Sequence, residues 1–383
     1  MRTLLIIISL FFVCSSIRAQ IENISTKYDL PNTISETSGL LFFDGKLITH
    51  NDSGNSANLY ELDTISGSIT RTISITNATN VDWEDITQDE TYIYIGDFGN
   101  NNGNRQDLKI YRVLKADFTN NTNVDAETIS FNYEDQSDFS SKPNNNNFDA
   151  EAISIYKNQL IIFTKNWIDN TVNAYSIPKS IGNHIAKKVS TYNSSGLITG
   201  ATYNKDDESF LLCGYTTLAV PFLIYVDTKN TANNDVFSGL TEKTELTSSI
   251  GQGSQIEGIT NINGEKYFLS RERVETTING NPFILPQKLY RFDNGSYSPL
   301  SIEHYTYSKV EIYPNPTSSV LHIKNIDLKS IKSIKIINAV GKTILNSKKN
   351  SSQISIKNLT AGLFYLQIQL NNNSILRKKF IKY

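Results

Sequence analysis

Short runs of alternating apolar and polar residues, separated by polar turns, fill the chain between about residues 25 and 305. This alternation is typical of half-buried β-strands. Similar runs return in the same order, so the region reads as an internal repeat. One set of equivalent strands is expected at Leu47–Thr49, Tyr92–Ile95, Leu160–Phe163, Phe210–Leu212 and Tyr267–Leu269. The following set is expected at Leu59–Leu62, Leu108–Arg112, Val172–Tyr175, Phe222–Val226 and Leu289–Phe292.

Each copy opens with an anchor, in which an acidic residue precedes a short apolar strand. The anchors stand at Glu36, Glu84, Glu151 and Glu257, with a degenerate copy at Gly200 that lacks the acid. A propeller blade of four strands needs about 40 to 50 residues plus loops, which fits the spacing of the anchors. The pattern therefore predicts an all-β fold with a β-propeller over residues 20–305. Five blades are visible, and six is the alternative if one copy has diverged; an array of β-sandwiches is the weaker alternative.

The gap between Lys115 and Asn147 is longer than the other connections and is rich in Asn, Asp and Ser. A fourth strand is visible there at Thr128–Phe131. We expect the gap to contain this outer strand and a mobile surface loop.

The sequence pattern changes from about Lys309, where lysines become more frequent and short strands of alternating apolar and polar residues follow. We expect a small β-sandwich over residues 309–383. Its strands are predicted at Val310–Tyr313, Val320–Ile323, Ile334–Ile337, Ile354–Ile356, Phe364–Leu370 and Lys379–Ile381.

The first nineteen residues are predicted to be a signal peptide. Arg2 precedes the apolar run Leu4–Val13, which is too short to span a bilayer, and Ala19 offers a cleavage site. A lipoprotein modified at Cys14 is the alternative, but Val13 is a poor residue before such a cysteine. After cleavage only Cys213 remains, which excludes an intramolecular disulfide and is expected to be a buried core thiol. No later run predicts a transmembrane segment.

The overall charge excludes some partners. The chain has 36 basic and 38 acidic residues, a formal net charge of -2. Such a balance gives no general attraction to nucleic acid or to an anionic membrane. Serine-nucleophile elbows, Walker loops and zinc motifs are also absent from the sequence.

The innermost strands of a propeller surround its axis, so the anchors predict Glu36, Glu84, Glu151 and Glu257 close together. Crowded carboxylates repel one another, which raises their pKa values unless a partner offsets the charge. Ca²⁺, which prefers six to eight oxygen ligands, is one such partner. The alternatives are that these glutamates strap neighbouring blades through backbone hydrogen bonds, or that they act in catalysis.

The turns after the second strands should meet on one face and add further polar groups. A ring of this composition suits a polar or anionic ligand. The candidates are His50, Asp52, Asp97, Asn100, Arg105, Lys165, Tyr215 and Arg271.

The C-terminal module carries a family resemblance. It is similar to the type A sorting domain of the type IX secretion system of Bacteroidetes. This resemblance implies transport across the outer membrane by that machinery, and a secreted or cell-surface location. The matching segments are Tyr313-Pro-Asn-Pro316, Leu321-His-Ile323, Asn338-Ala-Val-Gly341, Leu359-Thr-Ala-Gly362 and Lys379-Phe-Ile-Lys382.

The central region resembles a group of secreted bacterial propellers of undefined function. More loosely, its Glu-Ala-Ile and Glu-Gly-Ile anchors resemble the esterase-like phytase and SdiA-regulated groups, which implies a calcium-dependent hydrolase. The strings that carry the first resemblance are His50-Asn-Asp-Ser-Gly54, Asp82-Trp-Glu-Asp-Ile86, Gly96-Asp-Phe-Gly-Asn100 and Asp149-Ala-Glu-Ala-Ile153.

Three functions remain open at this point. The favoured one is an exported propeller that binds a polar ligand at its acidic channel mouth, with Ca²⁺. The second is a metal-dependent phosphoester or ester hydrolase, in which Asp52, Asp97, Glu84 and Glu151 are ligands or base while Lys165 and Arg271 stabilise anionic oxygens. The third is an adhesive surface protein that uses its outer faces. The fold alone does not choose among them.

Overall fold

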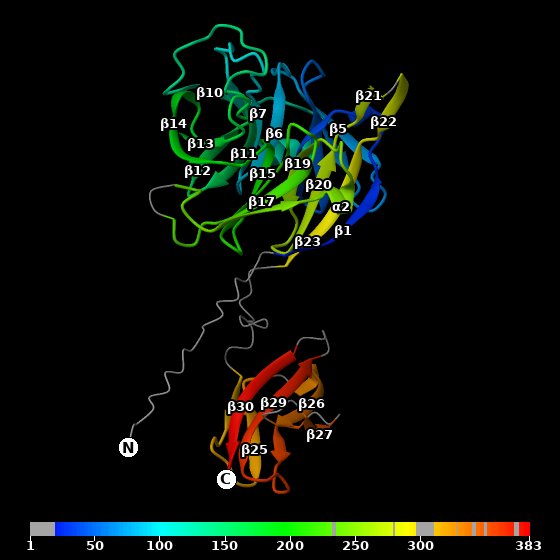
Figure 1. Ribbon diagram of the computed structural model, residues 1–383, viewed down its shortest axis with the longest axis vertical. Coiled ribbons are helices and arrows are strands. Elements are labelled where there is room, and N and C mark those ends of the chain that lie inside the picture. Colours follow the sequence, from blue (N-terminus) through cyan, green and yellow to red (C-terminus); the bar gives the residue numbers. More distant parts are fainter. Residues whose placement is uncertain are drawn as a thin grey trace, which may run out of the picture. The chain divides into compact units, whose positions relative to one another are not determined.

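A computed structural model describes residues 20–231, 235–278, 280–295, 310–326, 328–338, 342–347, 351–370 and 375–383. The predicted signal peptide and the boundary between the two predicted domains lie outside these residues. The described residues up to 295 form one compact unit, and those from 310 onward form a second (Figure 1). Each unit is described by itself below.

The first unit is built from mainly antiparallel sheets in which most neighbouring strands follow one another in sequence. The first sheet holds β2 (Thr37–Phe43), β3 (Lys46–Asn51), β4 (Asn58–Leu62), β5 (Ile69–Ile75) and the short β9 (Asn123–Val124). The next strands are β6 (Trp83–Gln88), β7 (Tyr92–Asp97), β8 (Lys109–Leu114) and β10 (Glu127–Tyr133), then β11 (Ala150–Tyr156), β12 (Gln159–Thr164), β13 (Val172–Pro178) and β14 (Gly182–Tyr192). These eight form one sheet, because β10 and β14 pair in parallel and join two four-stranded halves.

Two further four-stranded sheets belong to the unit. One holds β15 (Leu197–Asn204), β16 (Ser209–Tyr215), β17 (Pro221–Asp227) and β18 (Thr241–Glu245). The other holds β19 (Ile256–Asn261), β20 (Lys266–Arg271), β23 (Lys288–Gly295) and β1 (Gln20–Asp29). Because β1 pairs with β23, the earliest described strand and the last strand of the unit share one sheet. This pairing ties the two ends of the unit together.

The strands β6, β11, β15 and β19 lie in the middle of the unit (Figure 1), and β2 is in contact with β6 and β19. Each contacts the next, and β19 contacts β2, so the five close a ring. Glycines allow this close approach. A Cβ on Gly39 would lie 2.6 Å from the Ile86 nitrogen, and one on Gly200 would lie 2.3 Å from the Glu257 carbonyl oxygen.

The core lies between neighbouring sheets rather than at the ring itself. Ile48 and Ile73 of the first sheet pack with Ile93 and Val113 of the second group of strands. A corresponding cluster brings together Leu47 of the first sheet and Leu289 of the last. Each sheet therefore buries apolar side chains against its neighbours, which explains why the pattern had to recur along the chain.

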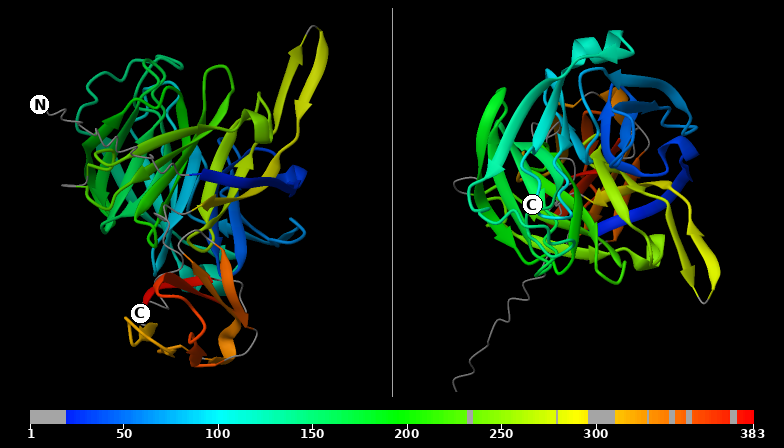
Figure 2. Two further views of the ribbon diagram at one scale, coloured as in Figure 1. Left: turned by 60° about the horizontal axis from the view of Figure 1, so that its bottom comes forward. Right: turned by 90° about the horizontal axis from the view of Figure 1, so that it is seen from above.

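Three features of this unit were not predicted. The gap after Lys115 begins with helix α1 (Lys115–Asn120). Its propensity is modest, but Phe118 is buried and Arg71 donates hydrogen bonds to the carbonyls of Phe118, Thr119 and Asn121. A hairpin of β21 (Val274–Ile278) and β22 (Asn281–Leu285) projects from the rest of the unit (Figure 2). The short helices η1 (Asn32–Ile34) and α2 (Thr247–Ile250) cover connections between strands.

The second unit consists of two small sheets that share one apolar core. The first holds β24 (Glu311–Tyr313), β25 (Val320–Lys324) and β28 (Gln353–Ser355). The second holds β27 (Thr343–Ser347), β26 (Ile331–Asn338), β29 (Gly362–Leu370) and β30 (Ile375–Lys382), and η2 (Leu328–Ser330) precedes β26. All six predicted strands coincide with observed ones, whereas β27 was not anticipated.

The all-β class predicted from the sequence is confirmed by this architecture. None of the described helices is long and apolar enough to cross a membrane. The single cysteine of the described chain, Cys213, is buried, and burial raises the pKa of its thiol well above the usual value.

Candidate functional site

The pairing of first and second strands sets which residues share a level around the ring. Thr37 pairs with Asn51, Trp83 with Asp97 and Ala150 with Thr164. In the other two ring strands, Ile198 pairs with Gly214 and Ile256 with Arg271. The next residue along each ring strand therefore stands at an equivalent position, and these residues are Ser38, Glu84, Glu151, Thr199 and Glu257. Three of the four predicted anchor glutamates stand at this level, and Ser38 takes the place expected for Glu36.

Four of these equivalent residues, all but Thr199, line a cavity of about 80 Å³ at the starting ends of the ring strands. Five carboxyl groups and one ammonium group face it. Its lining is Ser38, Asp52, Glu84, Asn101, Glu151, Lys165, Tyr215, Gln255, Glu257 and Glu272. The surplus of acidic groups makes it a strongly negative cavity.

The buried carboxylates differ in what they contact. Glu151 forms an ion pair with Lys165, with 3.0 Å between Oε1 and Nζ. The Lys165 ammonium also lies 5.5 Å from the ring centre of Tyr215. Glu84 and Glu257 are only 4% and 7% exposed, and their carboxylates have no hydrogen-bonding partner in the described part of the chain. Unpartnered carboxylates in such a place are costly unless a cation or protons offset their charge.

Glu84 also belongs to a tighter group. One carboxylate oxygen each from Asp52, Asp82 and Glu84 lie within 4.8 Å of one another. Gly99 makes room for them, because a Cβ there would lie 2.2 Å from Oε1 of Glu84 and 2.5 Å from Oδ2 of Asp82. Three converging carboxylates with free oxygens are a donor set that suits a hard divalent cation.

The electrostatics of the cavity follow from burial and crowding. Burial, followed by the charges of Asp52 and Glu151, raises the pKa of Glu84 well above its usual value. Burial and the neighbouring Asp52 raise the pKa of Asp82 to about 7. The same two causes raise the pKa of Glu272 to about 7. Asp82 and Glu272 therefore exchange protons near neutral pH, where a bound cation would compete with the protons.

Lys165 shows the opposite response to the same surroundings. Its burial favours the neutral amine, but the negative groups around it, with Glu151 first among them and then Tyr215 and Glu257, together outweigh this effect and raise the pKa of the ammonium well above its usual value. Lys165 is therefore charged at neutral pH and neutralises one of the carboxylates.

Asp85, the residue after Glu84 in β6, links neighbouring strands through backbone hydrogen bonds, which is the role that the sequence had suggested for the glutamates. Its Oδ2 accepts hydrogen bonds from the backbone N–H groups of Ile153 (2.9 Å) and Ala201 (3.3 Å). Its Oδ1 accepts one from Ile86 at 2.8 Å. One fully buried side chain thus links the ring strands β6, β11 and β15.

Six of the predicted site residues lie outside the cavity, and Glu36 and His50 are two of them. Glu36 is exposed and accepts a hydrogen bond from Asn55. His50 is fully buried with its ring against Trp83, at 5.6 Å between ring centres, and burial lowers its pKa to about 4. His50 is therefore a neutral packing residue in this structure.

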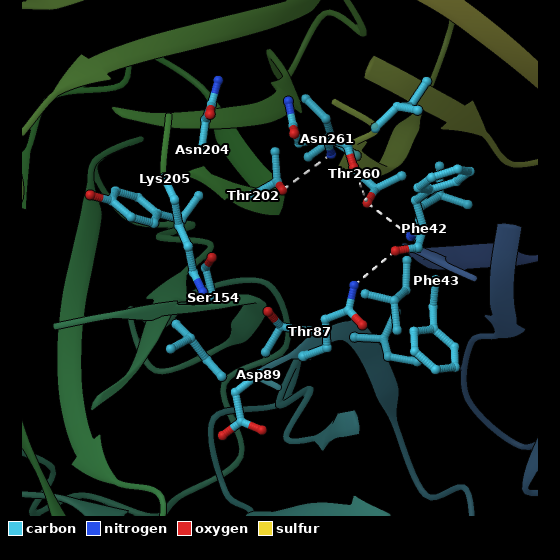
Figure 3. Close-up of a pocket in the computed structure, with 18 of the residues that line it drawn as sticks. Phe42, Phe43, Thr87, Asp89, Ser154, Thr202, Asn204, Lys205, Thr260 and Asn261 are labelled. Atoms are coloured by element: carbon cyan, nitrogen blue, oxygen red, sulfur yellow. Dashed lines mark hydrogen bonds between the residues drawn. The ribbon is translucent and has the colours of Figure 1, made fainter. Parts of the chain in front are cut away.

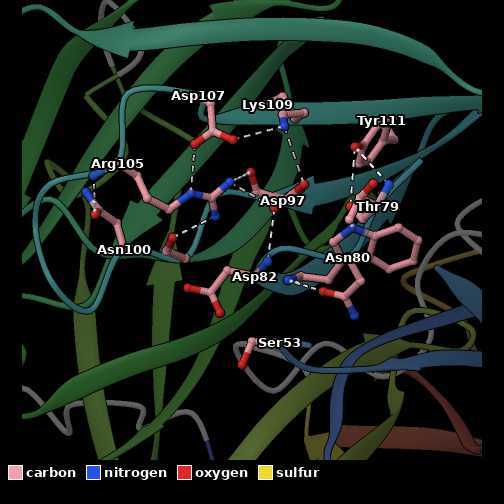
Figure 4. Close-up of polar contacts among 12 residues, drawn as sticks. Ser53, Thr79, Asn80, Asp82, Asp97, Asn100, Arg105, Asp107, Lys109 and Tyr111 are labelled. Atoms are coloured by element: carbon pink, nitrogen blue, oxygen red, sulfur yellow. Dashed lines mark hydrogen bonds and ion pairs between the residues drawn. The ribbon is translucent and has the colours of Figure 1, made fainter. Parts of the chain in front are cut away.

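A second polar network holds the turn after β7 (Figure 4). Arg105 pairs with Asp97 at 3.0 Å and with Asp107 at 3.2 Å, while Lys109 lies near both aspartates. Asp97 accepts the N–H of Asp82 at 3.1 Å, so this network positions one member of the carboxylate group.

The remaining candidates are also engaged by protein groups. The Asn100 amide donates to the carbonyl of Phe148 and accepts the N–H of Arg105. The Arg271 guanidinium donates to the Pro286 carbonyl and to the Ser254 hydroxyl. Of the predicted turn residues, Asp52, Lys165 and Tyr215 line the cavity.

Sequence reasoning missed several acidic and polar members of the site. Asp82 and Asp149 each stand two residues before an anchor glutamate, so a shared Asp-x-Glu spacing could have revealed them. Asp149 is fully buried and accepts hydrogen bonds from the Asn100 N–H and the Trp167 indole. Glu272 and Gln255 had no comparable signal, because each occurs in a single copy of the pattern.

Comparison with known proteins identifies the second unit. Residues 311–383 match the secretion system C-terminal sorting domain. This tail indicates secretion to the cell surface or exterior through the type IX system, and implies contact with its machinery. No curated protein matches the chain.

Solved structures show only distant similarity. PorZ, a surface component of the type-IX secretion system of Porphyromonas gingivalis, is 12% identical with a TM-score of 0.34, over 91% of this chain and 45% of that one. The extracellular domain of BT4673 from B. thetaiotaomicron is 9% identical with a TM-score of 0.33, over 95% and 59%. An exo-β-1,3-galactanase from Phanerochaete chrysosporium is 9% identical with a TM-score of 0.40, over 94% and 96%. The chain thus spans about half the length of the first two, and similarities this distant indicate no function for it.

Proposed function

We propose that the chain is an exported five-bladed β-propeller whose acidic cavity binds a divalent cation, Ca²⁺, and through it a polar ligand. Each group of four strands would be one blade, with β2, β6, β11, β15 and β19 as the inner strands. The ring contacts between these strands support this assignment. A propeller brings the starts of its inner strands together, as the cavity requires.

The observation that carries the cation proposal is the burial of the Glu84 carboxylate beside two other carboxylates. Its carboxylate is buried, lacks a hydrogen-bonding partner among the described residues, and lies within 4.8 Å of carboxylate oxygens of Asp52 and Asp82. Ca²⁺ would be held by these three residues, with the remaining positions filled by water or ligand oxygens. Glu151 is less available because Lys165 already pairs with it.

The size of the cavity favours binding over turnover. About 80 Å³ accommodates a cation and one or two waters, since a water occupies about 30 Å³ in the liquid. A polar ligand would contribute only one or two oxygens to the cation and lie mostly outside. Titration calorimetry with CaCl₂, for the purified protein and for Asp52→Asn, tests this proposal. It predicts a single binding event that the substitution weakens at least tenfold.

A hydrolase is the second candidate function, and the position of the Lys165 ammonium in the cavity is the observation that favours it. Lys165 is a buried ammonium in the same cavity as carboxylates whose raised pKa values suit a general base. Asp97 and Arg271 would not take part, because protein groups already engage both. An assay with p-nitrophenyl phosphate and p-nitrophenyl acetate, with and without CaCl₂, separates the candidates: cation binding without turnover supports the binding protein.

A further inference from the structure

The ring strands have a second cavity at their far ends, and it shares no lining residue with the acidic one. Its volume is about 540 Å³, within the range of small-molecule sites in proteins. All five ring strands contribute to it, so the site belongs to the ring rather than to one loop.

The walls near the ring carry hydroxyl groups and no charges. Four of the five ring strands place a hydroxyl-bearing residue at the equivalent position, and these residues are Thr87, Ser154, Thr202 and Thr260. The fifth strand, β2, has Leu41 at that position. Figure 3 shows the four hydroxyl-bearing side chains around the cavity. The charged residues that line other parts of it are of both signs, and they are Asp44, Asp89, Glu90, Lys115, Lys205 and Asp206. Asp89 is already paired with Lys179 at 2.7 Å.

Two of these hydroxyls are free to bind a ligand. Thr87 and Ser154 form no side-chain hydrogen bond with the described residues, although Ser154 is only 2% exposed. Because neither oxygen is held by a protein group, each hydroxyl can donate to or accept from a hydroxyl group of a ligand. By contrast, the hydroxyl of Thr260 already accepts the N–H of Phe42 at 3.1 Å, and that of Thr202 accepts the N–H of Asn261 at 3.4 Å.

Aromatic surface completes the chemistry of the cavity. Phe42 and Tyr203 are among the lining residues, beside the apolar floor of Ile86 and Ile259. Hydroxyl groups together with aromatic faces match a molecule with many hydroxyls on one edge and C–H groups on its faces. We propose that this cavity binds a neutral, polyhydroxylated ligand of monosaccharide to disaccharide size.

The test is a binding measurement on the purified protein with glucose, galactose, mannose, lactose, maltose and cellobiose in the presence of EDTA. At least one should bind with millimolar or better affinity. Thr87→Val and Ser154→Ala, which remove one hydroxyl each at nearly constant volume, should each weaken that binding about threefold to tenfold. The matched control Thr277→Val, on the exposed strand β21, should leave it unchanged. Melting curves check that each variant is folded.

Several results would overturn the inference. One is that none of these sugars binds at 10 mM, and another is that neither cavity substitution alters the binding. Tighter binding of glucose 6-phosphate than of glucose by more than tenfold would show that the site selects anions. Repeating the measurement in CaCl₂ separates the two cavities. Binding that is present in CaCl₂ and absent in EDTA would place the sugar at the acidic cavity, so that failure of this inference is distinguishable from failure of the cation proposal.

Discussion

The ammonium of Lys165 lies 3.0 Å from the carboxylate of Glu151, and both side chains are buried. This pair fixes the charge of the acidic cavity, because it neutralises one carboxylate and leaves the others to be offset by protons or a cation. Glu84 and Glu257 have no comparable partner among the described residues.

Removing one member of this pair should be strongly destabilising. Lys165→Met leaves Glu151 buried without its counter-ion, and we expect a loss of about 3 to 5 kcal/mol in the free energy of unfolding. The double variant Lys165→Met with Glu151→Gln should recover most of that loss, since residue 151 then carries no charge that needs a partner. Urea unfolding of four proteins, namely the wild type, Lys165→Met, Glu151→Gln and the double variant, measures the coupling. Equal losses in the single and double variants would show that the ion pair is not the cause.

The raised carboxyl pKa values predict how stability depends on pH in the absence of a cation. Asp82 and Glu272 have a pKa of about 7 in the folded chain and near 4 when unfolded. Between these values the folded state holds protons that the unfolded state has released, so the free energy of unfolding falls as pH rises. His50 acts in the opposite sense below about pH 6.5, because its pKa is lowered to about 4.

The effect of the carboxyl groups is therefore best measured between pH 6.5 and 8, where His50 does not oppose it. In EDTA the melting temperature should decrease across it, Asp82→Asn should reduce the slope, and saturating CaCl₂ should flatten it. A melting temperature that rises with pH in EDTA would contradict the assignment of raised carboxyl pKa values to the cavity.

Asp85 should matter for the ring rather than for binding. Asp85→Asn retains only one acceptor oxygen, which cannot serve both Ile86 and the pair Ile153 and Ala201. We expect a loss of about 1.5 to 3 kcal/mol in the free energy of unfolding. The control Asp44→Asn, at an exposed turn, should stay within about 0.5 kcal/mol of the wild type. An Asp85→Asn protein as stable as the wild type would show that the hydrogen bonds of Asp85 do not stabilise the ring.

The C-terminal module should be required for export. Deleting residues 309–383 removes the matched sorting domain, so the remaining protein should accumulate inside the cells of a host that has the type IX system. Immunoblots of cells and medium measure its location. A truncated protein that reaches the medium at the level of the full chain would argue against this role.

The sequence allowed the strands to be predicted better than the site. Alternating apolar residues located most strands of both units, and the recurring anchors located Glu84, Glu151 and Glu257. Glu36 was misplaced because the pairing of Thr37 with Asn51 puts Ser38, two residues later, at the level of the other glutamates. Its true equivalents are Asp82 and Asp149, which the anchors did not single out.

Other features depend on contacts that a sequence pattern does not specify. Helix α1 is held by the burial of Phe118 and the hydrogen bonds of Arg71, from a strand more than forty residues earlier. Arg271 and His50 looked available in their turns, yet the fold directs the first to a backbone carbonyl and buries the second against Trp83. Such outcomes follow from long-range packing.

The most direct test of the central claim is a thermal melt of the purified protein in 1 mM CaCl₂ and in EDTA. A cation that binds only the folded chain adds about 2.7 kcal/mol at one hundred times its dissociation constant, which for a domain of this size raises the melting temperature by several degrees. We predict this shift for the wild type and for the control Glu265→Gln, and its loss in Glu84→Gln. A wild-type melting temperature that is the same in CaCl₂ and EDTA would contradict the proposal that the acidic cavity is a cation site.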